Sequence, residues 1–121
     1  MCGILGSFVR YDNWSESVIS NSLLKINHRG PNNSSYRFFD FNQHRLTLGH
    51  TRLSIFDLSN AGNQPMSLDN NNLCVIYNGE IYNYLELKEK FIPKNIQFKT
   101  NTDTEVLLYL WKLMSENCLK H

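Results

Sequence analysis

The sequence predicts an α+β fold, in which strands and helices mix without the strict alternation that a parallel sheet requires. Hydrophobic residues make up 41% of the 121 residues, which is enough to bury a core. Short apolar runs of strand length are interspersed with amphipathic segments that carry helix-capping residues. No repeat, linker or low-complexity stretch divides the chain, so residues 1–121 are expected to belong to one domain.

In the first half of the chain, the pattern predicts a buried strand, a helix and a hairpin. Residues 2–9 form a short apolar run and predict the strand. Ser15 is expected to cap the helix, which should end at the Gly and Pro of Arg29-Gly30-Pro31. The hairpin strands are expected at residues 36–41 and 45–48, around Asn42-Gln43.

In the second half, the pattern predicts a loop over residues 57–69, then a strand and two helices. Residues 73–77 predict a buried strand that ends at the turn signal Asn78-Gly79. The helices should each begin with a capping box, in which the residue at the helix start and an acid three residues later each accept the backbone N–H of the other with their side chains. These boxes are Asn83 with Glu86, in a helix closed by Pro93, and Thr102 with Glu105.

Composition excludes several classes of partner. The formal net charge of +1 gives no basic surface for nucleic acid. No apolar stretch approaches the roughly 20 residues that span a bilayer, and the N-terminus lacks the basic region of a signal peptide. The three widely spaced cysteines suggest neither a disulfide framework nor a zinc site. A cytoplasmic location is therefore expected.

Cys2 offers a nucleophile at the start of the chain. It is a small residue directly after Met1, the situation in which an initiator methionine is usually removed. Removal would leave a thiol and a free α-amine in one residue, with reference pKa values of about 8.5 and about 7.7–8.0. The amine is then suited to act as general base near neutral pH. Taken alone, however, Cys2 is better explained as a small buried side chain at the start of a strand.

Six short motifs follow one another along the chain. They are Met1-Cys2-Gly3-Ile4, Arg29-Gly30-Pro31, Gly49-His50-Thr51-Arg52-Leu53-Ser54-Ile55, Asn63-Gln64-Pro65, Tyr77-Asn78-Gly79-Glu80-Ile81-Tyr82-Asn83 and Thr102-Asp103-Thr104-Glu105. Together they resemble the glutaminase domain of glutamine-hydrolysing asparagine synthetases, among the class II amidotransferases with an N-terminal nucleophile. The resemblance runs nearly from end to end.

The resemblance implies that residues 1–121 are the N-terminal portion of such a domain. Its fold would be part of an αββα two-sheet sandwich of the N-terminal nucleophile type, incomplete at the C-terminal end. In the family, further strands and an ATP-binding synthetase domain follow, and both are absent here. No cofactor is therefore expected in this chain, since ATP and magnesium are implied only for the absent synthetase domain.

The resemblance also assigns the catalytic residues. Cys2 would be the nucleophile, and Asn78 with Gly79 would donate hydrogen bonds to the oxyanion of the tetrahedral intermediate. Losing one such donor typically costs about 10²–10³ in rate. Without the resemblance, Asn78-Gly79 is explained as a tight turn after a strand, and both explanations are compatible.

Substrate-binding roles come from the same motifs. Arg52 would hold the α-carboxylate of glutamine, for which a planar guanidinium is suited. Asp103 would bind the α-ammonium. The remaining implied substrate contacts are Leu53, Ile55, Asn78, Gly79 and Glu80. From the residues alone, Arg52 is a surface arginine in a turn and Asp103 an acid favoured at a helix start.

Several other residues receive structural explanations. The histidines at positions 28, 44, 50 and 121 share no metal-ligand spacing, so no metal site is expected. A papain-like pair of Cys2 and His50 remains an alternative. Cys74 is expected to be an inert core thiol, and Cys118 to be structural or partly exposed. Asn32 departs from the family, which has an acid after Arg-Gly-Pro, and this departure is expected to weaken a loop contact.

The sequence therefore favours glutamine amidohydrolysis by Cys2, with ammonia passing to asparagine synthesis in the intact family enzyme. Glutamine is the expected substrate, and a synthetase domain or subunit carrying the missing part is the expected partner. Alternatives are a truncated or split chain without independent catalysis, a different ammonia acceptor, and another amidohydrolase with an N-terminal nucleophile.

Overall fold

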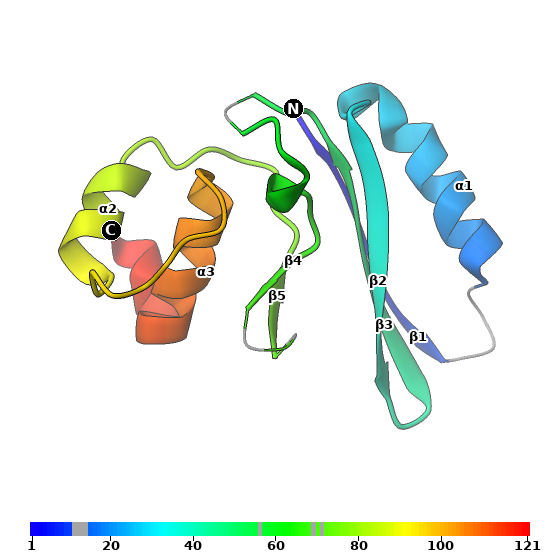
Figure 1. Ribbon diagram of the computed structural model, residues 1–121. Helices are drawn as coiled ribbons and strands as arrows, with labels where there is room; N and C mark the ends of the chain where they lie inside the picture. Colours follow the sequence, from blue (N-terminus) through cyan, green and yellow to red (C-terminus); the bar gives the residue numbers. More distant parts are fainter. Residues whose placement is uncertain (11–14, 56, 69, 71) are drawn as a thin grey trace.

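The computed structural model describes residues 1–10, 15–55, 57–68, 70 and 72–121. Four layers follow one another in Figure 1: helix α1 (Glu16–Ile26), a three-stranded sheet, a two-stranded sheet, and helices α2 (Tyr84–Phe91) and α3 (Asp103–Met114). The predicted α+β class is confirmed. Within the described residues, no helix is both long enough and apolar enough to cross a membrane.

The larger sheet is antiparallel and has the strand order β1-β3-β2. Its strands are β1 (Gly3–Arg10), β2 (Asn33–Phe41) and β3 (His44–Arg52). The predicted β2–β3 hairpin is confirmed, with both strands longer than expected. Asn42 in its turn has a φ of 51°, a conformation that asparagine tolerates better than most residues. Central strand β3 carries Arg52 at its end.

The prediction that residues 2–9 form a buried strand is wrong for one face of β1. Ile4 and Phe8 remain 52% and 62% exposed, whereas Gly3 on the other face is buried. This face of β1 is exposed for two reasons. The strand lies at one edge of the larger sheet, and the second sheet packs nearer to the opposite edge. There, the Ser35 hydroxyl of β2 donates to the Gln64 carbonyl at 2.5 Å.

Helix α1 covers the other face of this sheet, as Figure 1 shows. Ile19 and Leu23 are its buried residues. Ser15 is the N-cap as predicted, although its hydroxyl pairs with that of Ser17 instead of capping a backbone N–H. A 3-10 turn over Asn27–Arg29 continues the helix up to Gly30. A Cβ at Gly30 would lie 2.3 Å from the Thr51 carbonyl oxygen, so this close approach requires glycine.

The region predicted as a loop, residues 57–69, contains a short strand that the pattern missed, and Asp69 lies outside the described residues. Strand β4 (Met66–Leu68) pairs with β5 (Leu73–Val75), and β5 ends two residues earlier than predicted. Extending the register would place Tyr77 opposite Gln64. Instead, the Gln64 side-chain oxygen accepts the Tyr77 N–H at 2.5 Å, and Pro65 has no N–H to give to the ladder.

The two predicted capping boxes have different outcomes. At α3, the Thr102 hydroxyl accepts the Glu105 N–H at 3.3 Å, which confirms one half of the box. At α2, the prediction is wrong, because Asn83 makes no side-chain cap and donates to the His121 carbonyl at 3.2 Å. The end of the chain therefore takes the Asn83 side chain away from the helix start.

Glu105 does not complete its box but fixes the segment before α3. Its carboxylate accepts the backbone N–H groups of Lys99 and Thr100 and the Thr100 hydroxyl, all within 3.2 Å. The Glu105 side chain is buried, so these three donors replace the water that it loses. A buried acid thus sets the approach of the chain to the start of α3.

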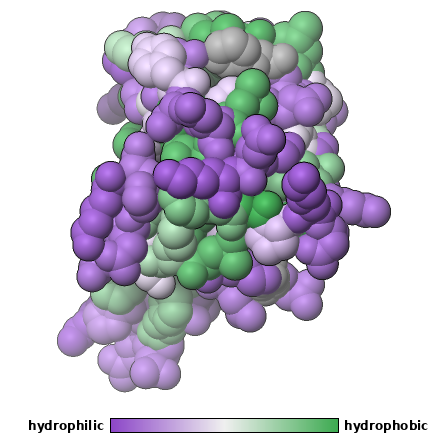
Figure 2. Space-filling view, turned by 90° about the vertical axis from the view of Figure 1, so that its left-hand side faces the viewer, coloured by the Kyte–Doolittle hydropathy of each residue, from purple (hydrophilic) through white to green (hydrophobic). Residues whose placement is uncertain are grey.

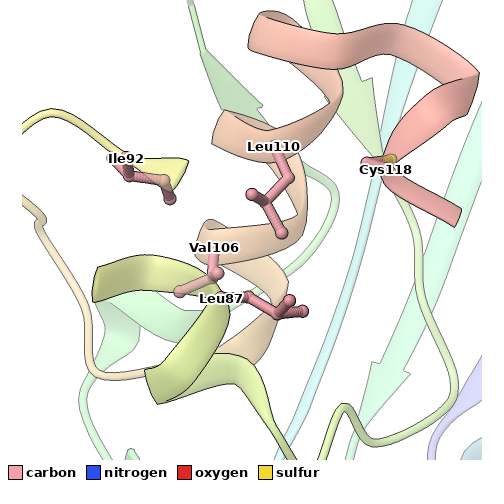
Figure 3. Close-up of a cluster of buried hydrophobic side chains, with 5 residues drawn as sticks. All are labelled: Leu87, Ile92, Val106, Leu110 and Cys118. Atoms are coloured by element: carbon pink, nitrogen blue, oxygen red, sulfur yellow. The ribbon is translucent and has the colours of Figure 1, made fainter. Parts of the chain in front are cut away.

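The main apolar cluster lies between α2, α3 and the C-terminal 3-10 helix Ser115–Lys120. Figure 3 shows its five buried side chains, which are Leu87, Ile92, Val106, Leu110 and Cys118. Cys118 is buried within this cluster, so its predicted structural role is confirmed, and burial raises the pKa of its thiol. Cys74 is only half-buried, so the prediction of a core thiol is wrong.

The outer side of α2 and α3 is mainly polar, with smaller apolar patches between the polar side chains (Figure 2). The last two helical segments keep several exposed apolar residues, which are Trp111, Leu113 and Leu119. On α3, Val106 and Leu110 point into the cluster of Figure 3 while Trp111 and Leu113 are exposed, because residues on opposite faces of a helix alternate between core and solvent.

Replacing Glu105 tests the role of this carboxylate in the fold. Glu105→Ala should lower the free energy of unfolding by about 3 kcal/mol, because three donors, two of them from the buried Thr100, lose their acceptor. Glu89→Ala, at an exposed position of α2, should change it by less than about 0.5 kcal/mol. Urea unfolding measures both, and similar losses in the two variants would contradict this account.

Candidate active site

All eight predicted site residues line one cavity of about 420 Å³. They are Cys2, Arg52, Leu53, Ile55, Asn78, Gly79, Glu80 and Asp103. They come from four places in the fold: the start of β1, the end of β3 with its following loop, the segment after β5, and the start of α3. The volume is in the range of small-molecule pockets. The fold thus brings together residues that are up to 101 positions apart.

Cys2 lies at the start of β1 and is held through both its side chain and its backbone. Its sulfur accepts the Leu53 N–H at 3.4 Å. The Arg29 Nε–H donates to the Cys2 carbonyl at 3.0 Å. The Arg29-Gly30-Pro31 loop therefore supports the residue at the cavity wall, and the sulfur lies beside the residue that follows Arg52.

Arg52 is only 6% exposed, so the explanation as a surface arginine is wrong. Its Nη1 donates to the Ser59 carbonyl at 2.7 Å and to the Asn63 Oδ1 at 2.9 Å. Its Nη2 donates to the Asp57 carbonyl. These contacts fix a charged, planar group at the cavity wall, where it is suited to pair with a carboxylate.

Gly62 makes room for this guanidinium. A Cβ at Gly62 would lie 2.4 Å from Arg52 Nη2 and 2.9 Å from Arg52 Cζ. Real Cβ atoms do not approach this closely, and the guanidinium is held by three acceptors. Any side chain at position 62 would therefore displace Arg52.

Asp57 ties the loop around Arg52 to the segment before α3. Its Oδ1 accepts the Ser59 N–H at 2.8 Å, and its Oδ2 accepts the Asn101 N–H at 3.0 Å. Hydrogen bonds from the Ser59 side chain, and then from the Asn101 and Ser59 backbones, lower the pKa of Asp57 to about 2. The carboxylate is therefore ionised at neutral pH and holds both segments.

Asp103 is the first residue of α3 and contacts the segment after Asn78-Gly79. Its Oδ2 accepts the Ile81 N–H at 2.9 Å, and its Oδ1 accepts the Thr104 hydroxyl at 3.3 Å. The helix-start explanation therefore holds, and Asp103 also lines the cavity. One carboxylate thus connects helix α3 to the Asn78-Gly79 segment.

The segment Asn78-Gly79 bends at Gly79 but does not form the tight turn that the sequence predicts. The φ of Gly79 is not positive, so it does not use the conformation that makes Asn-Gly a turn signal. Close packing requires the glycine instead, since a Cβ there would lie 2.5 Å from the Tyr77 hydroxyl. Burial, and then the charges of Asp103 and Glu80, raise the pKa of Tyr77.

His50 lies on β3 and is fully buried outside the cavity lining. Burial lowers its pKa to about 4, the nearby Tyr77 backbone raises it in part, and the charge of Arg52 lowers it further. Within the described residues, neither ring nitrogen has a partner at full hydrogen-bond geometry. No hydrogen bond therefore joins His50 to Cys2, so the geometry does not support a papain-like pair.

Asn32, which departs from the family pattern, makes a contact with the loop after β3. Its Oδ1 accepts the Ser54 N–H at 3.0 Å, a task that an amide oxygen performs as a carboxylate does. No group of three or more His, Cys, Asp or Glu side chains suited to a metal ion occurs in the part of the chain that the structure describes.

Several cavity residues were not singled out from the sequence. Three of them lie in the loop between β3 and β4, namely Asp57, Gly62 and Gln64, and a fourth, Thr104, lies in α3. Gln64 belongs to the Asn63-Gln64-Pro65 motif, to which the sequence assigns no role. This motif is the one sequence signal for the part that the loop plays in the cavity. The hydrogen bonds of Asp57 and Gln64 to other elements join residues distant in sequence, so no local pattern predicts them.

Comparison with known proteins identifies the family. The chain matches a family described as a glutamine amidotransferase domain over residues 1–121. The chain belongs to the glutamine amidotransferase domain family. The predicted resemblance is thus confirmed at the level of the family.

Three similar proteins are glutamine-hydrolyzing asparagine synthetases by name. A putative one from Methanocaldococcus jannaschii is 41% identical over 99% of this chain and 25% of its own length. A probable one from Acanthamoeba polyphaga mimivirus is 44% identical over 93% of this chain and 20% of its own. Asparagine synthetase 1 of Bacillus subtilis is 38% identical over 96% of this chain and 18% of its own. The chain thus spans a quarter or less of these relatives.

The buried His50 predicts an acid-sensitive fold. Because its folded pKa is below the unfolded value, the stabilising contribution is present above about pH 6.5 and is lost as pH falls towards about 4. The loss should be on the order of 3 kcal/mol. Between pH 7 and pH 4, the free energy of unfolding measured in urea should fall less for His50→Gln than for the parent. An equal fall in the two proteins would contradict this assignment.

Proposed function

We propose that the chain hydrolyses L-glutamine, with Cys2 as the nucleophile after removal of Met1. The observation that carries the proposal is the convergence of Cys2, Arg52, Asn78 and Asp103 on one cavity from four separate segments. Membership of the glutamine amidotransferase family supplies the substrate class.

In the proposed reaction, the Cys2 sulfur attacks the carboxamide carbon while the Cys2 α-amine accepts the thiol proton. The Asn78 side-chain amide and the Gly79 N–H donate to the oxyanion that forms. The amine then gives its proton to the leaving nitrogen, the C–N bond breaks, and ammonia departs. Water hydrolyses the glutamyl thioester, which releases glutamate and restores the thiol.

In the same proposal, the other end of the substrate is recognised by opposite charges. The Arg52 guanidinium pairs with the α-carboxylate, and its buried position fixes where that carboxylate lies. The Asp103 carboxylate pairs with the α-ammonium at the start of α3. Leu53, Ile55 and Glu80 line the cavity between these groups and contact the substrate chain.

We assign the four layers of Figure 1 to an αββα sandwich of the N-terminal nucleophile type. The exposed apolar side chains Ile4 and Phe8 support a sheet face that further strands cover. Synthesis of asparagine from aspartate, with ATP and magnesium, would need a synthetase unit outside these 121 residues. The unpaired thiols of the described residues fit a cytoplasmic setting for this reaction.

The alternative is a chain that needs assembly before it is active. The same exposed face of β1 favours it, because the start of β1 carries Cys2 and an uncovered sheet edge is a poor support for a nucleophile. In that case, glutamine hydrolysis would appear only when the remaining part of the protein is present.

Replacing the nucleophile tests the proposed function. Cys2→Ala should reduce the release of glutamate from glutamine to background, at least about 10³-fold, because no other group forms the thioester. Cys74→Ala removes a half-buried thiol outside the cavity and should retain activity. Enzymatic assay of glutamate measures both. Equal activity of Cys2→Ala and parent would overturn the nucleophile, and activity that appears only in assembly would favour the alternative.

Replacing Gly62 tests the substrate carboxylate site. Gly62→Ala should raise KM for glutamine about tenfold or more, because the new Cβ displaces the Arg52 guanidinium. Gly6→Ala is the matched control, since a Cβ at Gly6 meets nothing within 4 Å. Steady-state glutaminase kinetics measure both, and a KM for Gly62→Ala equal to that of Gly6→Ala would contradict the assignment of Arg52.

A further inference from the structure

We propose that Gln64 is a positioning residue that sets the distance between the oxyanion-binding segment and Asp103, and thereby the length of side chain that the site accepts. This inference rests on the proposed function, because it concerns the two ends of a bound glutamine. Gln64 is 6% exposed and borders the cavity.

The Gln64 side chain joins two elements of the site directly. Its Oε1 accepts the Tyr77 N–H at 2.5 Å, and its Nε2 donates to the Thr104 hydroxyl at 3.3 Å. The orientation of the amide follows from chemistry, because a backbone N–H only donates and must face the amide oxygen. Both contacts are made by one planar group, so the distance between them is nearly fixed.

These contacts belong to a closed ring of hydrogen bonds. From Gln64 the ring continues through the Thr104 hydroxyl, which donates to Asp103 Oδ1 at 3.3 Å. Asp103 Oδ2 accepts the Ile81 N–H at 2.9 Å. The ring therefore leaves the backbone at Tyr77 and returns to it at Ile81. The three residues between these points are Asn78, Gly79 and Glu80, the segment proposed to bind the oxyanion and the substrate.

The backbone ladder between β4 and β5 does not hold the segment after Val75 in place. Its last pair before the site is Met66 with Val75. Pro65 has no N–H with which to continue the ladder, so the Gln64 side chain takes the next backbone donor. The Gln64 carbonyl also accepts the Ser35 hydroxyl at 2.5 Å, which ties the same residue to the larger sheet.

The distance between the oxyanion-binding segment and Asp103 affects which substrate the site accepts. The amide carbon that Cys2 attacks and the ammonium that Asp103 binds are separated in glutamine by two methylene groups and the α-carbon. Asparagine has the same two end groups but one methylene fewer. A rigid spacing between the Asn78 segment and Asp103 therefore selects glutamine, whereas a loosened spacing lets the shorter amide reach both groups.

Two substitutions test the ring at different points. Gln64→Leu removes both side-chain contacts at nearly constant size. Thr104→Val removes only the hydroxyl that links Gln64 to Asp103. Gln97→Leu, the same chemical change at an exposed position, is the matched control.

We expect kcat/KM for glutamine to fall about 10²-fold in Gln64→Leu. Its preference for glutamine over asparagine, measured as the ratio of kcat/KM values, should fall at least about tenfold. Thr104→Val should raise KM more than it lowers kcat, because the oxyanion side keeps its contact with Gln64. The double variant should be no worse than Gln64→Leu, since both substitutions break one ring. Gln97→Leu should match the parent.

The outcomes separate this inference from the proposed function. Amide hydrogen exchange of Tyr77, faster in a folded Gln64→Leu, would show that the contact is lost. If kcat/KM and selectivity then equal those of the parent, the positioning role is overturned while the function stands. If Gln64→Leu does not fold, an unchanged KM in Thr104→Val overturns it. A folded parent without Cys2-dependent glutamate release overturns the function, and this inference with it.

Discussion

The buried guanidinium of Arg52 is the constraint on which the rest of the site depends. A permanent charge at 6% exposure needs hydrogen-bond acceptors, and three of them come from the loop between β3 and β4. That loop consequently wraps the guanidinium closely enough that position 62 must be glycine. The Asp57 carboxylate carries the constraint onward, because it anchors the same loop to the Asn101 backbone just before α3.

Two polar networks thus fix helix α3 relative to the sheets, and neither uses the main apolar cluster. One runs from Arg52 through Asp57 to Asn101, and the other from Tyr77 through Gln64 and Thr104 to Asp103. The apolar cluster holds α3 against α2 instead. Hydrophobic packing therefore builds the layer, whereas directional hydrogen bonds set its position at the cavity. This division suits a site whose groups must lie at defined distances from one substrate.

Much of this arrangement was predictable from the sequence, because it depends on local patterns or on motifs. The β2–β3 hairpin, the break at Gly30 and the Thr102 cap follow from turn and capping residues, and the eight cavity residues follow from the motif series. Non-local contacts were not predictable. The Asn83 side chain donates to the carbonyl of the C-terminal residue instead of capping α2. Strand β5 ends where the Gln64 side chain takes the place of the backbone ladder. Ile4 is exposed because the second sheet packs over the other edge of the larger sheet. Only three-dimensional proximity decides each of these.

The most direct test of the central claim, that Cys2 is the nucleophile of a glutamine site, is covalent labelling with an electrophilic glutamine analogue, mapped by peptide mass spectrometry. We predict one adduct, on a peptide that begins with Cys2 and lacks Met1, and protection of this site by excess glutamine. The half-buried Cys74 and buried Cys118 should remain unlabelled in folded protein. Equal labelling of Cys74, or labelling of Cys2 that glutamine does not reduce, would contradict the account.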